Sequence, residues 1–142
     1  MKNSQEILSS LLKTTQMGQI GIRSMLKNPI QHDLRNVLQT QLERFDEIEQ
    51  EAHEIAGSRG WEVDELNPSI KLMTNMMTAS RLKFSNSNSR AAEMMIRGNI
   101  RGVIKGIRNI HQYHGSDERI CSLAQNLIEC EQSNIRQMQG FL

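Results

Sequence analysis

The fold is decided by one stretch near the end of the chain, ICSLAQNLIECEQSNIRQM, residues 120–138. Its apolar residues recur every three or four positions, which is the spacing of a single helical face. Two polar residues, Glu131 and Asn134, fall within that face at its midpoint. Because a buried polar group without a partner costs on the order of a few kcal/mol, this stretch predicts a core helix that carries an internal polar layer.

Two further long helices are predicted in the first half of the chain. The first covers about residues 4–27. Asn28 then caps the second helix, Pro29 takes its first helical position, and Gln31 completes a capping box. This second helix continues to about Ile55, before two glycines break it. Because the turn between the two helices is tight, we expect them to pack as an antiparallel hairpin.

A crossover separates this hairpin from a second one. Asn67 and Pro68 repeat the cap-then-proline signal and begin a shorter helical segment, which ends at the Ser/Asn-rich run 85–89. A third long helix follows to about Tyr113, and Ser116 caps the last helix. The inward face of the third long helix is predicted to contain Ala92, Ile96, Asn99, Val103, Ile107 and Ile110.

The composition agrees with one all-α domain over residues 1–142. The chain is 37% hydrophobic but only 4% aromatic, with nine Met and two Pro, which favours helices over a sheet. A formal net charge of +1 provides no overall positive field, so we expect no nucleic acid partner. No segment has the apolar length of a membrane span or the pattern of a signal peptide, so we expect a cytoplasmic protein without a membrane partner. Two hairpins joined by a long helical crossover predict a ferritin-like four-helix bundle.

Each of the four long helices offers a polar side chain near its midpoint. On hairpin geometry Asn99 lies level with Glu131, and we expect the two to form a hydrogen bond. One shared layer explains four coincident polar intrusions better than four independent ones. The predicted polar layer comprises Thr15, Gln19, Gln41, Asn99, Glu131 and Asn134.

The topology and the Glu131-x-x-Asn134 segment resemble the ferritin-like di-iron superfamily, whose last helix carries Glu-x-x-His at this place. Three short segments are similar to a family of small bacterial ferritin-like proteins of unknown function: Gln16-Met17-Gly18, Gln39-Thr40-Gln41, and Glu93-Met94-Met95-Ile96 with Gly98 and Gly102. The superfamily resemblance implies a di-iron layer built from four helices.

The residues at those positions depart from the di-iron pattern. Asn134 stands where the resemblance implies a His, and Gln41 and Asn99 stand where it implies further metal ligands. One carboxylate among amides cannot balance the charge of two iron ions. We therefore expect no cofactor and predict a non-catalytic binding or assembly module, working as a homodimer.

Two alternatives remain open at the level of sequence. The first is an iron-binding protein or di-metal oxidoreductase of the ferroxidase type, with weak candidate ligands at Glu49, His53, His111, His114 and Glu131. The second is an anion-binding protein that uses a basic stripe on the third long helix, formed by Arg97, Arg101, Lys105 and Arg108. Gly98, Gly102 and Gly106 on the same helix predict the close approach of a neighbour, either the first helix or a second subunit.

Overall fold

The computed structural model describes residues 1–67 and 88–142. Over these ranges the chain forms four α-helices, namely α1 (Ser4–Leu26), α2 (His32–Arg59), α4 (Asn88–Gln112) and α5 (Glu118–Gln139). The all-α bundle predicted from the sequence is thereby confirmed. The expected crossover helix and positions 85–87 of the Ser/Asn-rich run lie outside the described residues. None of the four helices is long and apolar enough to cross a membrane.

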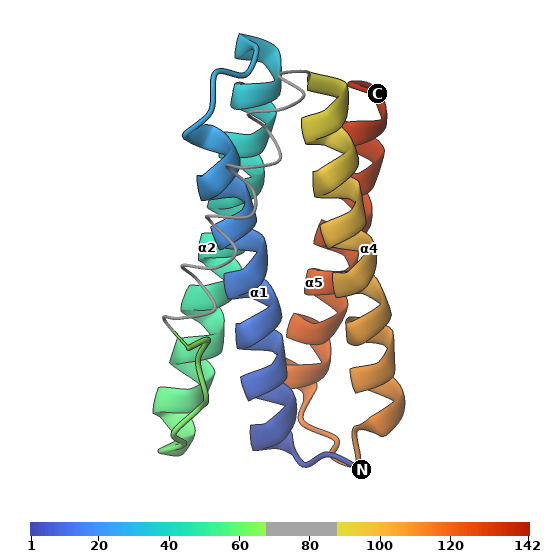
Figure 1. Ribbon diagram of the computed structural model, residues 1–142. Coiled ribbons are helices and arrows are strands. Elements are labelled where there is room, and N and C mark those ends of the chain that lie inside the picture. The colour runs from blue at the N-terminus through green and yellow to red at the C-terminus, as the bar shows by residue number, and fades with distance from the viewer. Residues whose placement is uncertain (68–87) are drawn as a thin grey trace.

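The four helices form two antiparallel hairpins that pack side by side (Figure 1). α1 packs against α2 and α4, and α5 also packs against α2 and α4, so α2 and α4 occupy opposite corners. α2 and α4 run in the same direction (Figure 1). α2 finishes at one end of the bundle and α4 starts at the other end (Figure 1). This arrangement is the one expected when a long crossover, rather than a short loop, joins the hairpins.

Apolar stripes on α1, α2 and α5 form the core. Leu11, Leu38 and Leu127 are among its fully buried side chains. α1 and α2 approach closely where Gly18 faces the ring of Phe45, because a Cβ on this glycine would lie 2.7 Å from ring carbons. Burial of these stripes supplies the main driving force for packing the helices together.

The turn between α1 and α2 differs from the sequence prediction. Asn28 does not cap α2, because its side-chain amide donates to the Ser24 carbonyl oxygen at 2.8 Å and so closes the end of α1. Pro29 accordingly lies in the turn, and α2 begins at His32 with Gln31 as its N-cap. Asn28 satisfies a carbonyl at the end of the first helix, so the cap-then-proline signal marks the turn rather than the first residue of the second helix.

α2 also ends later than predicted. Gly57 lies within the helix, which continues to Arg59 and ends where Gly60 adopts a φ of 65°. A left-handed residue at this place is a common way to close a helix, and glycine adopts the conformation without a Cβ penalty.

The N-cap of α5 is Asp117 rather than the predicted Ser116. Its carboxylate accepts from the backbone N–H groups of Arg119 and Ile120, which satisfies two otherwise free donors of the first turn. The same carboxylate accepts from the Arg59 guanidinium at 2.6 Å, tying the end of α2 to the start of α5. This bond to Arg59 is the main reason why the pKa of Asp117 lies below its ordinary value.

α4 is rotated relative to the sequence prediction. Ala92 and Asn99 are buried as expected, and Ile96 and Val103 are half-buried. The placement of Ile107 and Ile110 in the core was wrong, because both are exposed to solvent. The face that points into the bundle instead consists mostly of small or polar side chains: Ala91, Ala92, Met95, Asn99, Gly102, Gly106 and Asn109.

The small residues of α4 allow α5, not α1, to approach closely. A Cβ on Gly106 would lie 2.7 Å from Ile128 of α5, and a Cβ on Gly102 would overlap the carboxyl group of Glu131. Gly98 has open space around it. The glycine spacing therefore did predict a close neighbour, but the neighbour is the last helix of the same chain.

Candidate functional site: a polar layer inside the bundle

All six side chains of the predicted polar layer are buried, none being more than 5% exposed. One pair within the layer is bonded directly: the side-chain amide of Asn134 donates to the side-chain oxygen of Asn99 at 3.2 Å. The amide of Asn99 donates in turn to the carbonyl oxygen of Met95 at 2.7 Å. This chain of bonds links the midpoint of α4 to α5.

The other amide and hydroxyl members of the layer bind partners outside it. Thr15 Oγ1 donates to a carbonyl oxygen one turn back in α1 at 2.8 Å. Gln19 Nε2 donates to Asp46 at 2.8 Å, and Gln41 Nε2 donates to Gln137 at 2.8 Å. The buried polar residues therefore form separate local bonds, some within one helix and some between neighbouring helices, rather than the single network expected from the sequence.

Glu131 is the one carboxylate of the predicted layer, and it is 3% exposed. Its carboxyl group occupies the space that a side chain at position 102 would fill. The predicted hydrogen bond to Asn99 is absent, since Asn99 is bonded to Asn134 and Met95 and Glu131 Oε1 has no partner.

The environment of Glu131 favours its neutral form. Burial raises the pKa of this carboxyl group to about 8, because the charged form loses its hydration and gains no compensating partner. At neutral pH the side chain is therefore mostly a protonated acid that can donate one hydrogen bond. Such a group stabilises a packed interior far better than a bare carboxylate does.

The donor set does not fit a di-iron centre. Hard metal ions need several ionised oxygen ligands, whereas this layer offers amides and one carboxyl group that holds its proton. Within residues 1–67 and 88–142, no three His, Cys, Asp or Glu side chains lie close enough together to hold a metal ion.

The weak metal candidates outside the layer are separated. Glu49 accepts a hydrogen bond from Gln16 at 3.2 Å, while His53 lies 3.3 Å from the carboxylate of Glu65. His111 and His114 are exposed at the end of α4 and beyond it. These side chains thus belong to local surface pairs or to solvent and do not converge on one point.

The basic stripe of α4 is exposed to solvent along its whole length. Arg97 donates to Glu93 at 2.9 Å, and Arg90 binds the same carboxylate at 2.7 Å. The hydrogen bond from Arg97 is the largest reason why the pKa of Glu93 is lowered. Lys105 differs from the rest of the stripe, because it lines a pocket at the end of the bundle.

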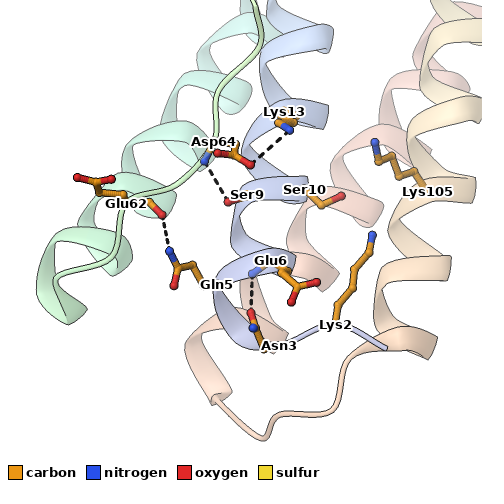
Figure 2. Close-up of a pocket in the computed structure, with 10 residues that line it drawn as sticks. All are labelled: Lys2, Asn3, Gln5, Glu6, Ser9, Ser10, Lys13, Glu62, Asp64 and Lys105. Carbon is orange, nitrogen blue, oxygen red and sulfur yellow. Dashed lines mark hydrogen bonds and ion pairs between the residues drawn. The ribbon is translucent and has the colours of Figure 1, made fainter.

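That pocket, of about 440 Å³, was not predicted from the sequence. Lys2 enters it because the N-terminal segment is clamped beside the end of α4 by backbone bonds from Lys2 N to Gln112 O and from His114 N to Lys2 O. The Lys2 ammonium group donates to the buried Asn109 at 3.0 Å. Figure 2 shows the remaining lining residues, which are Asn3, Gln5, Glu6, Ser9, Ser10, Lys13, Glu62, Asp64 and Lys105. The pocket forms where the N-terminal segment and α1 meet α4 and the segment that follows α2, so no local sequence pattern indicates it.

A search of solved structures finds a similar fold. A DUF305 fragment from Deinococcus radiodurans aligns with 96% of this chain and 93% of its own length, at a TM-score of 0.73 and 15% sequence identity. At this identity the likeness establishes the helical fold alone. No protein-family model matches the chain, and no curated protein matches its sequence.

Proposed function

We propose that this chain is a non-catalytic assembly module, a ferritin-like bundle in which polar side chains fix helix packing instead of holding metal, and that it works as a homodimer. The observation that carries the proposal is the position of the Glu131 side chain against Gly102. Its protonated carboxyl group fills the space left by Gly102, at the position where the resemblance implies an iron ligand.

The contacts around Glu131 support a role in helix register. The carboxyl group fits only opposite a residue without a side chain, and one turn away the Asn99–Asn134 bond joins the same two helices. Sliding α5 along α4 by one residue would break the amide pair and set the carboxyl group against a side chain. Buried polar groups are known to select one register in helical assemblies, at some cost in stability.

Anaerobic iron titration tests this proposal against the di-metal alternative. We expect no stoichiometric iron by elemental analysis and no ferroxidase turnover after loading with Fe²⁺ and exposure to oxygen. Glu131→Gln serves as the matched variant, and it should behave like the wild type. Stoichiometric iron in the wild type that is lost in Glu131→Gln would contradict the proposal and support an oxidoreductase.

A second candidate function, small-anion binding, would use the three lysines of the pocket at the end of the bundle. Lys2, Lys13 and Lys105 line the pocket with Ser10, which is 8% exposed, and an anion would compete there with Glu6, Glu62 and Asp64, of which Asp64 already lies 3.8 Å from Lys13. Titration with inorganic phosphate and polyphosphate at low salt tests this candidate, with Lys105→Ala as the pocket variant and Arg108→Ala as the exposed control. Binding weakened only by Lys105→Ala would support it, and no binding at low salt would remove it.

A further inference from the structure

The exposed apolar surface is concentrated on α4. Four isoleucines of this helix remain substantially exposed: Ile100 at 43%, Ile104 at 46%, Ile107 at 41% and Ile110 at 42%. Elsewhere in the described residues, the large hydrophobic side chains exposed to this degree are Met1, Met17 and Leu142, two of which are chain ends. Scattered exposed apolar residues are ordinary, whereas a continuous row on one helix marks an interaction surface.

Three of these isoleucines lie on a stripe with the spacing of a coiled-coil seam, which also includes the half-buried Ile96 and Val103. We call this stripe the isoleucine seam: Ile96, Ile100, Val103, Ile107 and Ile110. The steps between its successive members are four, three, four and three residues, which is the alternation of the a and d positions in a heptad, and Ile104 lies beside it at an e position. The centre of the seam lies about 100° around the helix from the face that packs in the bundle, so α4 has two separate packing faces.

We propose that the isoleucine seam binds the isoleucine seam of a second copy of this chain, with the two α4 helices antiparallel. This inference rests on the proposed function as an assembly module and names the surface that the homodimer uses. A seam with a 3.5-residue repeat packs its side chains into the gaps of another helix with the same repeat. An identical helix satisfies that requirement without any further partner.

The uniform composition of the seam is compatible with the antiparallel arrangement. Antiparallel coiled coils set a positions against d positions, and every a and d position of the seam is Ile or Val, so each layer holds two β-branched side chains. Antiparallel helices also oppose their dipoles favourably. In addition, the Glu93–Arg97 end of one seam then lies beside the His111 end of the other instead of beside a second Arg97.

Charge and area are compatible with a two-helix contact face. Arg101, Lys105 and Arg108 lie at heptad positions away from the seam. On a helical wheel, α5 places the exposed, uncharged Cys121, Gln125 and Gln132 on the side next to the seam. The four isoleucines expose on the order of 300 Å² of apolar surface, and this flank of α5 extends the face toward the roughly 800 Å² per partner that a stable interface needs.

The same face is less suited to a membrane surface. Helices that lie on membranes carry bulky residues such as Trp, Phe and Leu over a broad apolar face. The seam contains only Ile and Val, and the exposed flank beside it on α5 is polar. Binding to vesicles is therefore an outcome of the test rather than the expectation.

Sedimentation over a concentration series tests the inference. We expect the wild type to pass from a species of 16.3 kDa to one of twice this mass as its concentration rises. Ile107→Lys should raise the dimer dissociation constant at least about 100-fold, because it buries an unpaired charge in the seam. Met17→Lys is the matched control, since Met17 is 42% exposed on another helix, and it should dimerise like the wild type. Circular dichroism establishes that both variants keep the helical fold.

The possible outcomes distinguish a failure of the isoleucine seam as the dimer surface from a failure of the proposed assembly function. A wild type that dimerises, and an Ile107→Lys variant that dimerises equally well, would overturn the seam while leaving the assembly function in place. A wild type that stays monomeric up to about 1 mM would overturn both. A monomer that sediments with vesicles of anionic phospholipid would also overturn the inference, because the seam would then bind lipid.

Discussion

The protonated state of Glu131 predicts an unusual dependence of stability on pH. The carboxyl group has an ordinary pKa of 4.5 when the chain is unfolded, whereas burial raises it to about 8 in the bundle. Between these values the folded protein holds a proton that the unfolded chain has released. The free energy of unfolding must then fall as pH rises, by about 1.4 kcal/mol per pH unit and by about 5 kcal/mol over the whole interval.

Urea unfolding at pH values from 5 to 8 measures this effect. The full loss is comparable to the entire stability of many domains, so we expect the wild type to be markedly less stable at the upper end. Glu131→Gln should remove this component and therefore flatten the dependence of the free energy of unfolding on pH. Glu129→Gln, an exposed carboxylate on the same helix, is the matched control and should keep the wild-type slope. Equal slopes for the wild type and Glu131→Gln would refute the reasoning, since Glu131 would then be ionised in the folded protein.

Three further tests probe the packing and the helix cap. Glu131→Leu at pH 8 should leave the free energy of unfolding within about 1 kcal/mol of the wild type or increase it, because an apolar side chain replaces a buried ionisable one; a loss of several kcal/mol would show that the carboxyl group is needed. Gly102→Ala should lower the free energy of unfolding by about 2 kcal/mol or more, because the new methyl group displaces that carboxyl group. Gly98 has open space around it, so Gly98→Ala should raise the free energy of unfolding by about 0.5–1 kcal/mol. Equal effects of the two variants in thermal or urea unfolding would contradict the close approach of α5. Asp117→Ala should lower the free energy of unfolding by about 1–2 kcal/mol through loss of the α5 cap, whereas Ser116→Ala should lower it by less than about 0.5 kcal/mol. A larger loss for Ser116→Ala than for Asp117→Ala in urea unfolding would show that Ser116 is the cap, as the sequence predicted.

The apolar periodicity of the sequence predicts the inward faces of three helices. On α1, α2 and α5 the most apolar stripe is also the buried one, as Leu11, Leu38 and Leu127 illustrate. On α4 this correspondence fails. Gly102 must face α5 so that Glu131 fits, and that requirement rotates Ile107 and Ile110 out to solvent. A single sequence shows which residues share a face, but it does not show which of two possible faces a neighbouring helix covers.

The candidate site was predictable in burial but not in bonding. The positions of Glu131, Asn99 and Asn134 within helical stripes were enough to predict that they point inward. Their hydrogen-bond partners depend on side-chain direction and on the distance between the helices. Glu131 and Asn134 lie less than one helical turn apart on α5, so the sequence does not decide which of the two bonds Asn99, and the structure shows that Asn134 does. The pocket beside Lys2 depends on contacts between residues more than 100 positions apart, so no local pattern indicates it.

Thiol labelling tests most directly whether α4 turns its small residues inward and its isoleucines outward. The chain supplies its own references, because Cys121 is exposed and Cys130 is buried with a raised pKa. In a Cys121→Ser background and at a concentration where the protein sediments as a monomer, the thiol of Ile107→Cys should react about as fast as native Cys121. The thiol of Ala92→Cys should react as slowly as Cys130. An Ile107→Cys thiol as protected as Cys130 in that dilute monomer would contradict the account, because the isoleucine face would then lie within the bundle.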